Sequence, residues 1–129
     1  MMGFRILPRG PRGSIALEYA LLLPVLLLFI VGIMEVGRLM WTQTTLDRAA
    51  EAAARCAAVD QITCADAPAT ANYAVTQAFG LNVTSDAFTV APAACGKSVT
   101  ATFTYKFLVP FITPQDMTLH ASACYPLAG

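Results

Sequence analysis

The apolar residues of this chain are concentrated in one segment near the N-terminus. Residues 19–34 form an uncharged apolar run, and residues 14–17 extend it upstream past a single acid, Glu18. A helix that spans a membrane needs about 20 residues, within a range of about 17–25. Residues 14–34 therefore predict one transmembrane helix, with Glu18 near the membrane interface.

A cleaved export signal is the main alternative for this segment. It would need a small-x-small cleavage site directly after the apolar core, and residues 35–42, which read EVGRLMWT, contain no convincing one. We therefore expect the segment to stay as an anchor. Residues 1–13 form a short basic leader with Arg5, Arg9 and Arg12, and no acid precedes Glu18. This bias favours a cytoplasmic N-terminus.

The helical pattern continues beyond the membrane over residues 35–58, which predicts a periplasmic stalk. Seven alanines, the best helix formers, fall between positions 49 and 58. A helix over residues 14–58 would be roughly 67 Å long at the standard rise. A weakly apolar stripe is expected to face the rest of the protein, and it consists of Leu39, Thr42, Leu46, Ala49, Ala50 and Ala53.

The hydrophobic period changes in the last part of the chain, residues 59–129, which predict a small globular domain. Residues 59–71 are interpreted as a loop marked by Asp60, Asp66 and Pro68, and residues 70–79 as a short helix ended by Gly80. Residues 85–92, 97–107 and 117–124 are rich in Val, Thr, Phe and Tyr or alternate in polarity, which is typical of half-buried strands. The predicted fold class is α+β: a long N-terminal helix, then about three antiparallel strands covered by the short helix and the stalk.

The four cysteines, Cys56, Cys64, Cys95 and Cys124, all follow the membrane segment. An even number in a small domain favours disulfides in an oxidising compartment, ahead of free thiols or a metal site. A hairpin turning around residues 109–115 would put Phe107 near Met117 and Cys124 near Thr100. Cys95–Cys124 would then be within reach, and Cys56–Cys64 would tie the stalk to the following loop.

Composition and motifs narrow the functional class. The chain is 57% hydrophobic and only 12% charged, with zero net charge, so nothing favours nucleic-acid binding. It has no GxSxG, HExxH or phosphate-loop motif. A thiol enzyme would need a reactive cysteine beside His120, which the sequence does not favour. We expect neither a catalytic site nor a metal or other cofactor.

Gly13, Ser14, Glu18 and Tyr19 form the most informative group of residues. An acid in a membrane helix needs a partner. A cut after Gly13 would create an ammonium group on Ser14, four positions before Glu18 and on the same helical face. That group would be a counter-charge for Glu18 in the same subunit or in a neighbour. The simpler interpretation is an acid at a helix start that lies among the lipid headgroups.

The sequence GSIALEY, followed by apolar residues, resembles the prepilin peptidase site of type IV pilins. The run LLLPVLLLFIVGIMEVGR and the following DRAAEAAARCAA resemble more narrowly the TadE-like pseudopilins of tight-adherence (Flp/Tad) pili. The resemblance covers about residues 13–58. The positions that carry it within the apolar helix and its end are Pro24, Gly32, Ile33, Glu35, Gly37 and Arg38.

This resemblance implies a minor pilin-like subunit that assembles a tight-adherence pilus. Gly13 would be the last leader residue and Ser14 the first mature residue, while Glu18, followed by Tyr19, would guide assembly by pairing with a Ser14 amine. The implied partners are prepilin peptidase, other pilins and pseudopilins, the assembly platform of the inner membrane, and the lipid bilayer. Major Flp pilins are much shorter and lack a globular domain, which favours an accessory role. The alternative is an uncleaved, single-pass periplasmic domain that binds another envelope protein.

Overall fold

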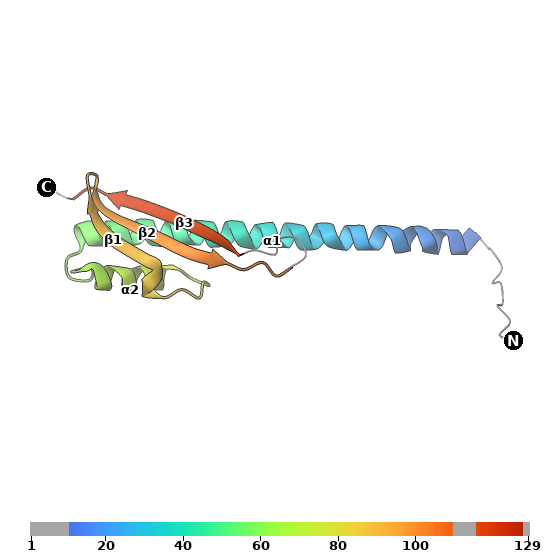
Figure 1. Ribbon diagram of the computed structural model, residues 1–129, viewed down its shortest axis with the longest axis horizontal. Coiled ribbons are helices and arrows are strands. Elements are labelled where there is room, and N and C mark those ends of the chain that lie inside the picture. Colours follow the sequence, from blue (N-terminus) through green and yellow to red (C-terminus); the bar gives the residue numbers. More distant parts are fainter. Residues whose placement is uncertain (1–10, 110–115, 128–129) are drawn as a thin grey trace. The chain divides into compact units, whose positions relative to one another are not determined.

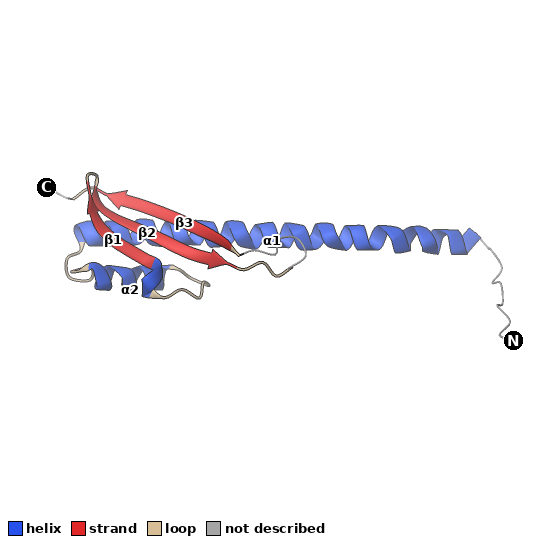
Figure 2. Ribbon diagram, viewed as in Figure 1, coloured by secondary structure: helices blue, strands red, loops and turns tan. Residues whose placement is uncertain are grey.

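The computed structural model describes residues 11–109 and 116–127. It contains a long helix, a short helix, a 3-10 turn and three strands, in the α+β arrangement expected from the sequence (Figures 1 and 2). The described chain divides into two compact units, one up to Val36 and one from Gly37 onward. The elements are α1 (Pro11–Val59), α2 (Ala67–Gln77), η1 (Ser85–Ala87), β1 (Phe88–Ala93), β2 (Gly96–Tyr105) and β3 (Met117–Tyr125).

Helix α1 agrees closely with the helix predicted over residues 14–58. It continues through Pro24, which has no N–H to donate to the helix. In the first unit its large apolar side chains, from Ile15 to Met34, are exposed. By length and composition, α1 is apolar enough to cross a membrane. Exposed apolar side chains on every side of a helix are what a lipid environment favours.

The second unit is built on the part of α1 that follows Gly37. The stripe expected from the sequence is confirmed, because Leu46, Ala49, Ala50 and Ala53 are completely buried. These side chains share one core with residues of α2 and of the sheet. Thr42 is also buried, and its hydroxyl donates to the carbonyl oxygen of Arg38 at 2.9 Å, so the polar group is satisfied.

The three strands form one antiparallel sheet in the order β1-β2-β3, which lies along the C-terminal half of α1 in Figure 1. The alternation predicted for the second strand is confirmed: Val99, Ala101 and Tyr105 are buried, while Thr100 and Thr102 are exposed. Leu119 and Ala121 of β3 complete the inward face. The sheet therefore has one covered face and one polar face.

The strand register differs from the one expected. Tyr105, and not Phe107, pairs with Met117, and Ser98, and not Thr100, pairs with Cys124. Strand β2 ends at Tyr105, two residues earlier than expected. Because side chains alternate with a period of two, a shift of two residues leaves the same side chains on the buried face. Of the hairpin expected around 109–115, residues 110–115 lie outside the described residues.

Helix α2 begins at Ala67, within the segment 59–71 that was predicted to be a loop. Asp66 is its N-cap, and its carboxylate accepts the Ala69 N–H at 2.8 Å. Pro68 was interpreted as a loop residue, but it lies in the first helical turn, where its missing N–H costs nothing. Gly80, with φ +77°, follows the Ala78 C-cap as expected for a helix end.

Candidate functional site

The residues singled out from the sequence lie at the start of α1. The helix begins at Pro11, so Gly13 is in its first turn, and a Cβ added to Gly13 would meet no atom within 4 Å. Ser14, Glu18 and Tyr19 are exposed. Their four-residue spacing puts Ser14 and Glu18 on one face of the helix. The structure thus presents the Gly13–Ser14 peptide bond and the Glu18 carboxylate on one open surface.

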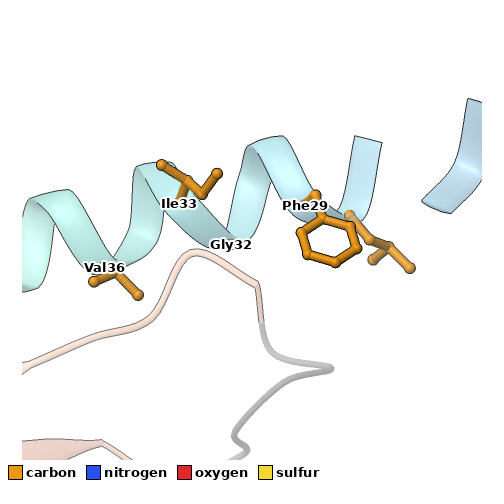
Figure 3. A pocket seen from close by; sticks show the side chains of 5 residues that line it. Phe29, Gly32, Ile33 and Val36 are labelled. Carbon is orange, nitrogen blue, oxygen red and sulfur yellow. The ribbon is translucent and has the colours of Figure 1, made fainter. Parts of the chain in front are cut away.

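Further along the first unit, α1 carries shallow apolar grooves. One is centred on Gly32, where a Cβ would meet nothing within 4 Å. Phe29 and Val36 lie on either side of this glycine in Figure 3, and Leu28 and Ile33 complete the lining. A second groove runs beside Tyr19 and Phe29. Small residues that let another apolar surface approach closely are typical of helices that pack in membranes.

The second unit is held by two disulfides with the pairing favoured from the sequence. Cys56 is bonded to Cys64, with their Cα atoms 5.8 Å apart, and Cys95 to Cys124, with Cα atoms 6.2 Å apart. The first bond is buried beside Ala57. The second joins the β1–β2 turn to the end of β3.

Asp60 organises the loop that the Cys56–Cys64 disulfide closes. One carboxylate oxygen accepts the N–H groups of Ile62 and Thr63, at 3.0 and 3.1 Å. Hydrogen bonds from the side chain and N–H of Thr63, and then from the Ile62 N–H, lower the pKa of the Asp60 carboxyl. The sequence marked Asp60 only as a loop residue. Its role as a hydrogen-bond centre was missed, although an acid two and three positions before free N–H groups is a usual signal of such a turn.

The chemistry available elsewhere in the second unit is limited. His120 is exposed on β3, and its carbonyl oxygen accepts a hydrogen bond from Nε2 of Gln43 at 2.9 Å, which joins α1 to the sheet. Within residues 11–109 and 116–127, no group of three or more His, Cys, Asp or Glu residues could hold a metal ion. All four cysteines are bonded in two pairs, so none of them is a free thiol.

Comparison with known families points to the same end of the chain. The family model described as "TadE-like protein" matches residues 13–55, which is about one third of the 129 residues. The match begins at Gly13 and runs through the apolar segment into the part of α1 that belongs to the second unit. Neither the curated proteins nor the solved structures give a match. The resemblance inferred from the sequence is therefore confirmed for residues 13–55.

Proposed function

We propose, from the TadE-like character of residues 13–55, that this protein is a minor pilin-like subunit needed to assemble a tight-adherence pilus. The observation that carries the proposal is where the family match begins, at Gly13, so that it includes Ser14, Glu18 and Tyr19 together with the whole apolar run. TadE-like proteins are a structural family, and the proposed role is structural rather than enzymatic.

Processing by prepilin peptidase after Gly13 is the first part of this proposal. The Gly13–Ser14 bond lies in the first turn of α1, where a helix opens most easily. The space beside the Gly13 Cα, where a side chain would be, is open, which supports access by a peptidase. The cut would leave an ammonium group on Ser14, four residues before the exposed Glu18 carboxylate.

Placement in the inner membrane is the second part. We infer that residues 14–34 span the bilayer, that the N-terminus is cytoplasmic, and that the domain after residue 58 is periplasmic. The three arginines of the leader support this orientation. Two disulfides in the second unit support an oxidising compartment on that side. The apolar grooves along α1 are then available to lipid and to the helices of other pilins.

The N-terminus of the protein in cell membranes tests this function. In cells that contain prepilin peptidase, mass spectrometry should find a chain starting at Ser14, which is 129 − 13 = 116 residues long. The Gly13→Leu variant should retain the leader, because a bulky leucine then replaces the small residue that precedes the cleaved bond. Gly10→Leu is the matched control and should be cleaved normally. An intact leader in wild type would favour the uncleaved, anchored domain instead.

Glu18 tests the assembly step of the same function. Glu18→Ala should insert into the membrane and should be cleaved, but pilus formation should fall strongly, because the Ser14 ammonium would lose its counter-charge. Glu51→Ala removes another exposed acid of α1, in the second unit, and should leave pilus formation unchanged. Normal piliation of the Glu18 variant would contradict the pairing.

A further inference from the structure

Two large aromatic side chains of the second unit are left outside its core. Trp41 of α1 is 65% exposed, and Phe79, just after α2, is 72% exposed. Met40, the neighbour of Trp41 in α1, is exposed as well. We call Trp41 and Phe79 the aromatic patch. Grouped apolar side chains at a surface mark contact with another protein or with a membrane.

The fold brings Gly80, the residue after Phe79, next to Trp41 through a turn that needs glycine. Gly80 has φ +77°, and a Cβ at this position would lie 4.0 Å from Nε1 of Trp41. The Leu81 N–H donates to the Ala78 carbonyl oxygen at 3.2 Å, and both of these side chains pack in or against the core. The turn is thus anchored by the residues on either side of Phe79 and Gly80. Phe79 is thus held at the surface, one residue before the glycine that approaches Trp41.

The position of Trp41 in the chain identifies what the patch can contact. Trp41 comes seven residues after Met34, the last residue of the apolar run, and seven residues of α-helix rise about 10 Å. The polar layer on each side of a bilayer is about 5–8 Å thick. A side chain at this height, pointing back along the helix, reaches the headgroup layer. Tryptophan is enriched at that depth, and Trp and Phe together form the apolar face of segments that lie in the interface.

We propose that the aromatic patch is a lipid-binding surface that seats the second unit on the headgroup layer of the membrane. The occupant is the lipid interface, because Trp41 lies on the same helix, α1, seven residues after the end of the apolar run. The charged residues near the start of the second unit and at the ends of β2 and β3 are of mixed sign. The Arg38 guanidinium carbon lies 5.6 Å from the ring centre of Tyr105, Lys106 follows that tyrosine, and Asp116 precedes its strand partner Met117. Binding therefore rests on apolar contact and needs no anionic lipid.

The proposal uses the membrane placement of the proposed function but not its cleavage step, and the single tryptophan of the chain makes it testable. The full chain is reconstituted in phosphatidylcholine vesicles that contain lipids brominated either near the headgroup or deep in the acyl chain. In the double variant Trp41→Phe, Phe79→Trp, we expect quenching by the shallow bromine and a several-fold lower quenching by aqueous iodide than at a fully solvated site. Wild type, which reports on Trp41, should behave in the same way.

Two further variants serve as controls, each combined with Trp41→Phe. Ile62 is 94% exposed on the loop beyond the end of α1, so Ile62→Trp should be quenched fully by iodide and not by bromine. Leu26→Trp, in the middle of the apolar run, should be quenched by the deep bromine. Non-reducing mass spectrometry checks that both disulfides are intact, and the leader-bearing and cleaved forms should give the same result.

Three outcomes would overturn the proposal. A tryptophan at position 79 that is as open to iodide as one at position 62, while position 26 is quenched by lipid, would show that the patch does not touch the membrane. Protection from iodide that rises with the protein-to-lipid ratio, without bromine quenching, would assign the patch to a second copy of the chain. An unquenched tryptophan at position 26 would remove the membrane placement itself, whatever the state of the leader.

Discussion

At the scale of single residues, one glycine is required by the backbone while another is exchangeable. Gly96 begins β2 with φ +131°, a conformation that side chains disfavour. A Cβ there would overlap the carbonyl oxygen of Tyr125 and lie 2.7 Å from the Cα of Pro126. Gly37, in α1, has open space where a Cβ would be. The two positions therefore respond in opposite directions to the same substitution.

We predict that Gly96→Ala destabilises the second unit, because the backbone must leave its conformation or the end of β3 must move away. The expected loss in the free energy of unfolding is about 1–3 kcal/mol. Gly37→Ala should stabilise the unit by about 0.5–1 kcal/mol, since alanine is the better helix former. Urea unfolding of the detergent-solubilised chain, followed by tyrosine and tryptophan fluorescence, measures both. Equal changes for the two variants would contradict this assignment.

At the scale of elements, periodicity predicted which residues face inward, but not the start of α2 or the register of β2 and β3. The buried stripe of α1 and the alternation in β2 depend only on the helical and strand repeats, and both were predicted. The strand register was wrong by two residues, because registers that differ by two bury the same side chains. The start of α2 was missed because the Asp66 cap was not recognised and Pro68 was interpreted as a loop residue. In a first helical turn the missing N–H of proline costs nothing.

The same distinction applies to the functional residues. Gly13, Ser14, Glu18 and Tyr19 are neighbours on one helix, so their arrangement could be predicted from spacing alone. Trp41 and Phe79 are far apart in the sequence, and the turn at Gly80, next to Phe79, is what approaches Trp41. The exposure of Phe79 could not be predicted from local sequence, because it depends on how the turn after α2 is anchored to the core. Features that depend on tertiary packing required the structure.

The cap of α2 leads to a prediction at this scale. Asp66→Ala removes the acceptor for the Ala69 N–H, and should lower the free energy of unfolding by about 1 kcal/mol. Asp66→Asn is the matched control, because asparagine caps a helix about as well and should stay close to wild type. Urea unfolding of the two variants under the same conditions separates loss of the cap from loss of the charge. Similar losses for both would assign the effect to the charge.

At the scale of the whole molecule, the second unit combines a thin core with two covalent links. Most of the buried apolar residues in the described chain are alanines, which bury little area each. A small domain with such a core depends on additional links. The loops closed by Cys56–Cys64 and Cys95–Cys124 have sequence separations of 8 and 29. Loop entropy gives about 2.5 kcal/mol for the shorter link and about 3.5 kcal/mol for the longer.

These two links differ in exposure, and this predicts the order in which they are reduced. Cys95 and Cys124 are exposed, whereas Cys56 and Cys64 are only 9% and 4% exposed. A thiolate must reach a sulfur atom to exchange with it. A mild thiol reductant should therefore open Cys95–Cys124 first in the folded protein, while Cys56–Cys64 persists until the second unit unfolds. Timed alkylation followed by peptide mass spectrometry measures the two rates. In urea, where both bonds are accessible, the rates should converge, and equal rates in the folded protein would mean that burial does not protect the shorter link.

Because the longer link is both the more stabilising and the more accessible, its reduction should remove most of the disulfide contribution to stability before the core opens.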